Sequence, residues 1–298
     1  MKTRVVVVAC ALTLGVGASL HAQTTLRWKL NPGESLAVAV TQTTKSTVAS
    51  AGKTTATDIK LDMELLWRVL SAEKGQFRLE QSIKRLSISL DAPPAGRVQY
   101  DTAQEAKPIG AAKEIAASLA PLLAAKVEIT MNERGEVLEA KSASATAEPA
   151  GASAAASLIS KESIQQLLKQ PLIVLPKEAV SVDETWPKTS ELTTSLGPVK
   201  QTTTYRYAGP VEQDGQKLEK IEAKTELAPA APDMSKLMMK EHQQQGEVLF
   251  DLAAGRVFKA TQVQTLVTER PYRETQIVVT LKSQQQTTIS PAKEAASP

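Results

Sequence analysis

Apolar and polar residues alternate at period two over several long stretches of the chain. The clearest stretch places on one face of an extended chain Leu61, Met63, Leu65, Trp67 and Val69. Such alternation is typical of a strand that buries one face in an antiparallel sheet. The pattern recurs at residues 77–90, 199–207, 221–227, 248–252, 257–267 and 275–289. The chain is therefore predicted to form a long-stranded antiparallel meander.

One predicted strand contains a change of parity. Its apolar residues occupy odd positions up to Leu79 and even positions from Leu86 onward. A β-bulge near Lys84 and Arg85 would keep both sets on the same face and would bend the strand. The sheet is therefore expected to be curved.

Three segments have the periodicity of short amphipathic helices. The first covers residues 104–125, where Pro121 is expected to kink or restart it; the second covers 158–169 and stops at Pro171; the third is capped by Asp233. Their apolar stripes are Ile115, Leu119, Leu122 and Leu123, then Ile164, Leu167 and Leu168, then Met234, Leu237 and Met238. The predicted fold class is α+β, mostly β, with long-stranded curved antiparallel sheets and a few short helices packed over the apolar face.

A segment poor in large apolar side chains divides the chain near its middle. Residues 142–157 are nearly all Ala, Ser, Gly and Pro, which is typical of a linker or mobile loop. This segment separates an N-terminal β-rich half, residues 23–141, from a C-terminal β-rich half, residues 158–290. Residues 291–298 are predicted to be a disordered tail on the same compositional grounds.

The two halves resemble each other weakly. Trp67 lies eight residues before Gly75, as Tyr207 lies eight residues before Gly215. A second correspondence places Gly135, Val137 and Ala140 against Gly255, Val257 and Ala260. These spacings suggest an internal duplication.

Residues 1–22 have the three parts of a secretory signal. A positively charged start precedes the apolar residues 5–14, and the segment ends in the small residue Ala22. Cleavage is expected after Ala22, so the mature chain would begin at Gln23 and would be periplasmic or extracellular. The alternative is a lipoprotein signal ending at Cys10, for which the preceding apolar run is too short.

Removal of this signal narrows the possible chemistry. It removes Cys10, the only cysteine, and leaves His242 as the only histidine. Disulfides, iron–sulfur clusters, a cysteine nucleophile and a Cys/His zinc site are then excluded. The formal net charge, +3 for the full chain, falls to +1 without Lys2 and Arg4; with 3% aromatic residues and dispersed basic residues, this argues against nucleic acid as a partner. No later segment approaches the ~20 apolar residues of a membrane-spanning helix.

Candidate catalytic and metal-binding groups are few. His242 has polar neighbours and no accompanying GxSxG or SxxK motif, so a catalytic triad is not indicated. Met234, Met238, Met239 and His242 would suit copper, but their spacing is equally that of a buried helical stripe. We therefore favour methionine packing and expect no metal site.

A pair of carboxylates is the remaining candidate for a catalytic site. Asp62 and Glu64 share a face of one predicted strand, but it is the polar face. Solvent there would keep both carboxylates ionised, whereas glycoside hydrolysis needs one of them protonated. We predict no catalytic, cofactor-binding or metal-binding residues, and no cofactor.

Eight short sequence phrases follow one another in order along the predicted mature chain. They are residues 26–29, 32–34, 100–101, 135–137, 182–186, 205–209, 250–251 and 255–256, which read LRWK, PGE, YD, GEV, VDETW, YRYAG, FD and GR. Together they resemble a domain of unknown function in uncharacterised, signal-peptide-bearing exported proteins of planctomycete-type bacteria. The resemblance implies export and the fold, and it transfers no site residue.

Most of these phrases are typical of turns and core anchors. Residues 32–33, 132–135 and 251–255 are predicted turns, the last two of them hairpin loops in which glycine supplies a positive φ. The tryptophans Trp28, Trp67 and Trp186 are expected to anchor the core.

The leading functional hypothesis is a non-enzymatic envelope or secreted binding or scaffold module. Its curved sheet would present an apolar concave face that sequesters an apolar ligand or lipid. One alternative is a structural protein–protein interaction module of the cell surface. A second alternative is a hydrolase with an unrecognised carboxylate site.

Overall fold

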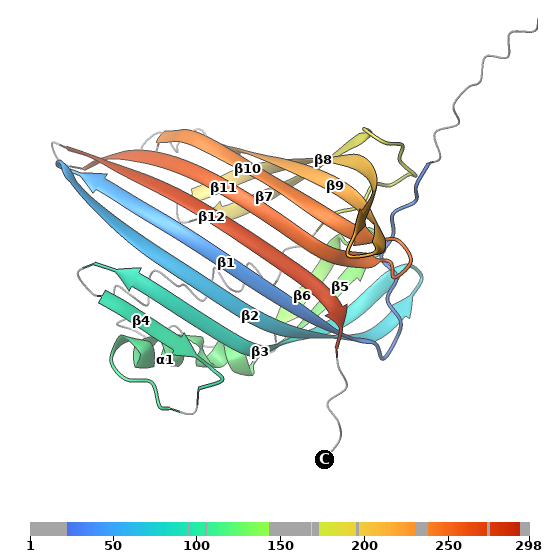
Figure 1. Ribbon diagram of the computed structural model, residues 1–298, viewed down its shortest axis with the longest axis horizontal. Coiled ribbons are helices and arrows are strands. Elements are labelled where there is room, and N and C mark those ends of the chain that lie inside the picture. Colours follow the sequence, from blue (N-terminus) through green and yellow to red (C-terminus); the bar gives the residue numbers. More distant parts are fainter. Residues whose placement is uncertain are drawn as a thin grey trace, which may run out of the picture.

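Long antiparallel strands dominate the structure, a computed structural model (Figure 1). It describes residues 23–93, 96–104, 106–142, 168, 173–194, 197–229, 238–272 and 275–292. The strands are β1 (Ser35–Ser50), β2 (Lys53–Glu73), β3 (Gln76–Ala92), β4 (Gly96–Asp101), β5 (Lys126–Asn132), β6 (Val137–Ser142), β7 (Thr185–Thr194), β8 (Gly197–Gln213), β9 (Gln216–Pro229), β10 (Met238–Asp251), β11 (Arg256–Tyr272) and β12 (Thr275–Pro291). One described helix, α1 (Ala111–Ala124), follows β4.

All of these strands belong to one open sheet. Its order is β6-β5-β3-β2-β1-β12-β11-β10-β9-β8-β7, and β4 pairs with β3 beside this path. The antiparallel, mostly β architecture predicted from the alternation is confirmed. Because β1 pairs with β12 along nearly their whole lengths, strands from the two halves of the chain form one continuous sheet.

The predicted β-bulge is confirmed at the expected place. Glu64 on β2 pairs with Arg85 on β3, but the next residue, Leu65, pairs with Ile83, which leaves Lys84 as the extra residue. Further register shifts occur in β2–β3, β5–β6, β8–β9 and β10–β11. Figure 1 shows the long strands twisting and curving together, as bulged strands do.

The core lies at one end of the sheet, which we call the base. There β1 directs Leu36, Val38 and Val40 to the face that we call the inner face, and all three are buried. The base core also contains Leu26, Trp28, Leu30, Met63, Leu65, Trp67, Val69, Phe77, Leu79, Ile173, Leu175, Val180, Trp186, Tyr205, Tyr207, Ile221, Val248, Phe250 and Val257. The prediction that all three tryptophans anchor the core is therefore confirmed.

Helix α1 covers part of the inner face. It contacts β3 and β4, and its buried residues Ile115, Leu119 and Leu122 are those of the predicted stripe. The helix begins later than predicted, after Gly110, whose φ of 56° is not helical. It also runs without interruption through Pro121, which costs one backbone hydrogen bond near its end.

The third predicted helix is wrong at its C-terminal end, where the structure has a strand. Met238 and Met239 begin strand β10, which continues through His242 into the strand predicted from residue 248. The preceding residues 230–237 lie outside the described residues. Here the inner positions of the strand are occupied by His242 and Gln244, so they carry no apolar signal.

Other predicted segments fall partly outside the described residues. These include the signal at residues 1–22 and residues 143–157 of the predicted linker, whose first residue, Ser142, still belongs to β6. Of the second predicted helix only Leu168 is described, and it is buried. Strand β12 runs through Pro291, the first residue of the predicted tail. Among the described residues, no helix is long and apolar enough to span a membrane.

The two halves share local geometry at equivalent turns. Lys74 and Gly75 between β2 and β3 have φ values of 52° and 74°, and Asp214 and Gly215 between β8 and β9 have the same values. Strands β6 and β11 then bulge at equivalent positions, three residues after Gly135 and Gly255 respectively. These correspondences relate β2-β3-β5-β6 to β8-β9-β10-β11 and support the hypothesis of an internal duplication.

Candidate functional site

The N-terminal segment of the described chain closes the base. The backbone N–H of Trp28 donates to Glu133 O at 2.8 Å, and that of Lys29 donates to Gly255 O at 2.7 Å. The segment therefore lies between the β5–β6 turn and the β10–β11 turn, which belong to different halves of the chain. Both turns are the predicted hairpin loops, with positive φ at Gly135 and Gly255.

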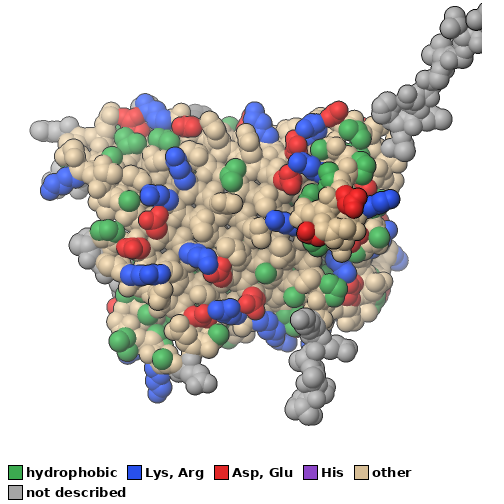
Figure 2. Space-filling view, viewed as in Figure 1, with side chains coloured by type: hydrophobic (Ala, Val, Ile, Leu, Met, Phe, Trp, Pro, Cys, Tyr) green, Lys and Arg blue, Asp and Glu red, His purple; other side chains and the backbone are tan. Residues whose placement is uncertain are grey.

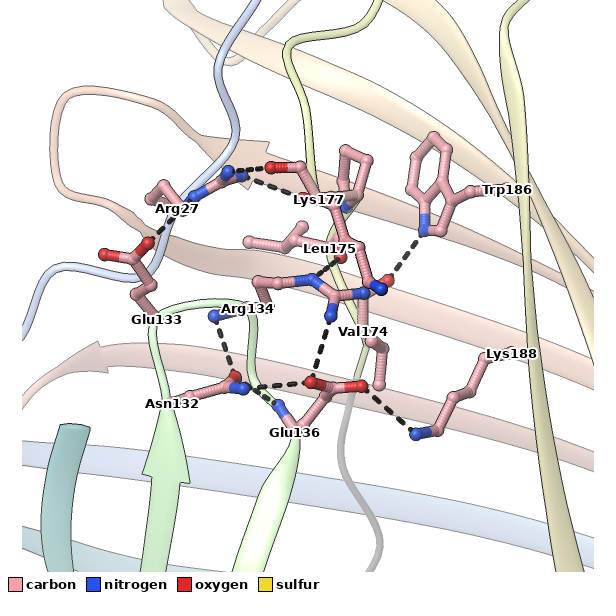
Figure 3. A network of polar contacts seen from close by, with 11 residues as sticks. Arg27, Asn132, Glu133, Arg134, Glu136, Val174, Leu175, Lys177, Trp186 and Lys188 are labelled. Atoms are coloured by element: carbon pink, nitrogen blue, oxygen red, sulfur yellow. Dashed lines mark hydrogen bonds and ion pairs between the residues drawn. The ribbon is translucent and has the colours of Figure 1, made fainter. Parts of the chain in front are cut away.

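A polar network fastens the segment at residues 173–177 to this closure (Figure 3). Arg134 donates through Nε to Leu175 O at 2.9 Å and pairs with Glu136 at 3.0 Å. Glu136 also pairs with Lys188 at 3.2 Å and accepts from Asn132 at 2.9 Å. Hydrogen bonding from Asn132, together with the two cations, holds the pKa of Glu136 below its usual value.

Arg27 completes the network on the other side of the closure. Its guanidinium donates to Pro176 O at 2.8 Å and to Lys177 O, and it pairs with Glu133 at 3.2 Å (Figure 3). Trp186 Nε1 donates to Val174 O at 2.7 Å. Each of these groups has a hydrogen-bond or ion-pair partner within the protein, so the network stabilises the fold of the base.

Most of the phrases behind the sequence resemblance meet in this base. Beyond the contacts above, Glu34 pairs with Arg256, and Asp183 pairs with Arg206. Tyr207 donates to Glu219, and burial with that carboxylate raises the pKa of Tyr207 to about 12. The phrases therefore specify turns and a packed closure, as predicted.

The candidate carboxylate pair lies on the opposite face, the outer face of the sheet. Asp62 pairs with Lys60 at 2.9 Å, and Glu64 pairs with Arg85 at 3.3 Å. Their side chains are 38% and 57% exposed. Arg85 also binds Asp101 at 2.8 Å, and this contact lowers the pKa of Asp101. Asp62 and Glu64 thus sit in surface ion pairs on a curved sheet face.

The candidate metal ligands lie along strand β10. Met239 pairs with Thr268 and His242 with Leu266, so both sit opposite β11 in an extended register. Met234 lies outside the described residues. Among the residues that the structure describes, no group of three His, Cys, Asp or Glu side chains could hold a metal ion.

Above the base, the described inner-face residues in the next two rows of strands β1, β12, β11, β10, β9 and β8 include no charged side chain. One row crosses six adjacent strands in register and consists of Thr44, Ser283, Gln264, Gln244, Thr225 and Thr203. The row nearer the base carries Gln42, Gln285 and Gln262 on β1, β12 and β11. We call these nine residues the neutral belt.

Belt side chains contact one another along and across strands. Gln42 Nε2 donates to Thr44 Oγ1 at 3.2 Å, and the hydroxyls of Thr203 and Thr225 lie 2.9 Å apart. Gln264 Nε2 lies 3.4 Å from Nε2 of His242, which borders the belt. Burial lowers the pKa of His242, so this ring is neutral at neutral pH.

Apolar side chains return beyond the belt. Leu281 on β12 pairs with Leu266 on β11, and Val48 on β1 pairs with Val279 on β12. We call these four residues the apolar rim. Leu266, Val279 and Leu281 are partly exposed and Val48 is 39% exposed, whereas the base residues are buried.

The outer face has a different chemistry. Figure 2 shows Lys, Arg, Asp and Glu side chains scattered over the face that is viewed in Figure 1. Ion pairs on it join Lys220 to Glu247 at 2.6 Å and Lys240 to Glu269 at 2.9 Å. The contrast between a charged outer face and an uncharged belt and rim marks the inner face above the base as the candidate binding site.

Sequence reasoning predicted an apolar concave face but not its composition. The belt residues at positions 42, 44, 283 and 285 alternate with outer residues that are also polar, and those at 262 and 264 flank the apolar outer residue Val263, so period-two hydrophobicity does not detect a belt on the inner face. A usable signal is the alternation of charge: Lys45 and Lys282 occupy outer positions, whereas neighbouring inner positions are uncharged.

The pairing between β9 and β10 covers only part of the two strands. It ends at Gln244 and Thr225, although β9 continues to Pro229 and β10 begins at Met238. A groove of about 630 Å³ lies there, lined by residues 224–227 and 239–245. His242 and Thr225 therefore face a gap between diverging strands.

Comparison with known proteins places the chain in a family but gives no function. A lipovitellin structure concerned with lipid–protein interactions is 13% identical, with a TM-score of 0.46; the match covers 91% of this chain and 27% of lipovitellin. The chain thus spans about a quarter of lipovitellin. An outer membrane channel from Pseudomonas putida F1 is 8% identical, with a TM-score of 0.25 and coverage of 88% and 97%. With TM-scores below 0.5, these likenesses do not extend to function.

No curated protein matches the chain by sequence. The model of a family of unknown function, DUF6263, matches residues 74–255, which is well over half of the 298 residues. The predicted domain of unknown function is therefore confirmed, while export and the bacterial group stay predictions. The chain belongs to the DUF6263 family.

Proposed function

We propose that this protein is an exported, non-enzymatic binding module that holds an apolar or amphipathic ligand against the inner face of its sheet. The observation that supports this proposal is the succession of base, neutral belt and apolar rim along one face of the central strands. A ligand with an apolar chain would bury the rim, and its polar end would exchange hydrogen bonds with the belt.

The partial exposure of the rim supports a binding role over a purely structural one. Leu266, Val279 and Leu281 retain accessible surface although they lie on the face that is fully packed at the base. Covering such surface is favourable by about 25 cal/mol per Å² of apolar area. Contiguous accessible apolar side chains rimmed by polar ones are typical of binding sites.

The divergence of β9 and β10 favours a second candidate, a protein–protein interaction module. Backbone groups at the facing edges, residues 226–229 and 238–243, lie beyond the last β9–β10 pair. Unpaired strand edges bind additional strands by main-chain hydrogen bonding. A partner that used this gap would protect the amides of residues 238–243 from hydrogen exchange, whereas a ligand on the rim would leave them unchanged.

A fluorescent acyl-chain probe tests the leading proposal. The probe should bind saturably, and Leu266→Asp should weaken binding at least tenfold, since a carboxylate would enter the rim. The matched control is Val263→Asp on the same strand, whose side chain is on the outer face and 51% exposed. Equal binding by both variants and the wild type would contradict the proposal.

The export part of the proposal has its own test. The periplasmic or secreted protein should begin at Gln23, one residue before the bridge between Thr24 and Val180 that starts the closure of the base. A mature terminus at a lipid-modified Cys10 would contradict cleavage after Ala22.

A further inference from the structure

The neutral belt limits the head group that a bound amphiphile can carry. Its six-strand row runs in register from Thr44 on β1 to Thr203 on β8. At about 4.8 Å per strand, the row extends for roughly 24 Å across the sheet. Every position in it is an amide or a hydroxyl, so each can both donate and accept a hydrogen bond.

Among the residues that the structure describes, the charged and titratable side chains that border this row are paired or neutral. At its β7 end, Lys188 pairs with Thr203 in the strand register, but its ammonium binds Glu136 at 3.2 Å. At its other end, Ile59 on β2 pairs with Thr44. His242, which contacts Gln264, is held neutral by burial at neutral pH.

An anionic head group would therefore be poorly matched to the belt. Phosphate recognition in proteins uses Arg or Lys, or backbone N–H groups at helix N-termini, because a desolvated anion is stabilised by opposite charge or by several donors that converge on one point. Glutamine and threonine side chains instead suit hydroxyl, ester and amide groups, which are uncharged and exchange single hydrogen bonds. The cost of moving a phosphate from water to such a surface is not offset there.

We infer that the ligand of the inner face is an acyl lipid whose head group is uncharged and bears hydroxyl or ester groups. This inference rests on the proposed function, since it assigns the head group of the amphiphile that the apolar rim holds. The belt lies between the buried base and the rim, so the head group points toward the base and the acyl chain extends toward the ends of the strands.

Two matched lipids test the inference by competition against the fluorescent acyl probe. 1-Oleoylglycerol and its phosphate ester share an acyl chain and a glycerol and differ only by the phosphate. At neutral pH, with both lipids below their micellar concentrations, 1-oleoylglycerol should displace the probe at a concentration at least tenfold lower than the phosphate ester.

A variant that introduces a positive charge strengthens the test, because it is expected to gain affinity for the phosphate ester. Gln264→Lys places a cation in the belt and should reverse the preference, so that the phosphate ester competes better than 1-oleoylglycerol. The control is Gln284→Lys on β12, which occupies an exposed outer position and pairs with Val263. This control should keep the wild-type preference.

The outcomes separate the inference from the proposal beneath it. Equal competition by the two lipids, or better competition by the phosphate ester in the wild type, would overturn the head-group assignment while leaving ligand binding intact. A Gln284→Lys reversal equal to that of Gln264→Lys would overturn the assignment of the belt as the selecting surface. Absence of saturable probe binding would overturn the proposed function itself.

Discussion

Replacement of Gly135 by alanine tests whether the closure of the base is as tightly packed as its contacts indicate. Gly135 has a φ of 82° in the β5–β6 turn. A Cβ at this position would lie 2.5 Å from Ile173 O and 2.6 Å from Trp28 Nε1. Both neighbours belong to buried residues, so neither can move away without disturbing the core.

Two costs add for Gly135→Ala. The left-handed backbone conformation costs an alanine about 1–2 kcal/mol relative to glycine. Insertion of a methyl group into a packed region costs a further 1–3 kcal/mol, roughly, because the backbone of the 173–177 segment must shift. The free energy of unfolding should therefore fall by about 2–5 kcal/mol in total.

Gly215→Ala separates the two costs. Gly215 has a φ of 74°, and a Cβ there would meet nothing within 4 Å. This variant should lose only the conformational part, about 1–2 kcal/mol, and any entropic gain from restricting the unfolded chain is common to both variants. Urea denaturation followed by tryptophan fluorescence should show the larger midpoint decrease for Gly135→Ala at an unchanged m value. Equal losses would refute the reasoning.

Trp67→Ala should lower the free energy of unfolding by about 3–5 kcal/mol, because Trp67 is only 8% exposed in the base core; a loss below 1 kcal/mol in urea denaturation would contradict the packing. Since burial lowers the folded pKa of His242 below 6.5, the unfolded chain takes up the proton first and stability should decrease as pH falls below about 6.5; His242→Gln should lose less over this range, and identical pH profiles would contradict the assignment. Glu136 has a lowered folded pKa, so its stabilisation is present above the ordinary value of 4.5 and lost as pH falls; Glu136→Gln should be less stable at pH 7 and less sensitive to acid, and an unchanged acid sensitivity would argue against it. The protein beginning at Gln23 should keep its melting temperature in chelator or reductant, because it contains no cysteine; a decrease of several degrees would reveal a missed metal.

The part of the fold that could be predicted consists of strands whose two faces differ in hydrophobicity. In β2 the apolar residues from Leu61 to Val69 alternate with polar ones except at Leu66, so face and burial could both be read from the pattern. The bulge at Lys84 was equally predictable, because one extra residue keeps the apolar side chains before and after it on the same buried face.

Strand β10 shows why the rest could not be predicted. Its first half has glutamine and histidine on the inner face, so the usual hydrophobic signal is missing where the candidate site lies. Met238 fitted a helical spacing in the sequence, but its pairing with β11 decides its conformation in the structure. A local pattern cannot reveal that six distant strands align their polar residues into one row.

The contacts of the base were also beyond sequence reasoning. Arg134 and Glu136 were recognisable as part of a turn, but their partners at Leu175 and Lys188 lie 41 and 52 residues away in the chain. Only the register of the whole sheet brings them together. The phrases shared with a family therefore indicated important residues without indicating that their role is to close the base.

The location of a bound acyl chain tests the central claim most directly. An acyl probe with a photoreactive group near the end of its chain, cross-linked to the full protein and mapped by mass spectrometry, should label inner-face rim residues such as Leu266, Val279 and Leu281. Labelling should be competed by 1-oleoylglycerol. Predominant labelling of outer-face neighbours such as Val263 and Val278, or labelling that excess competitor does not reduce, would contradict a lipid site on the inner face.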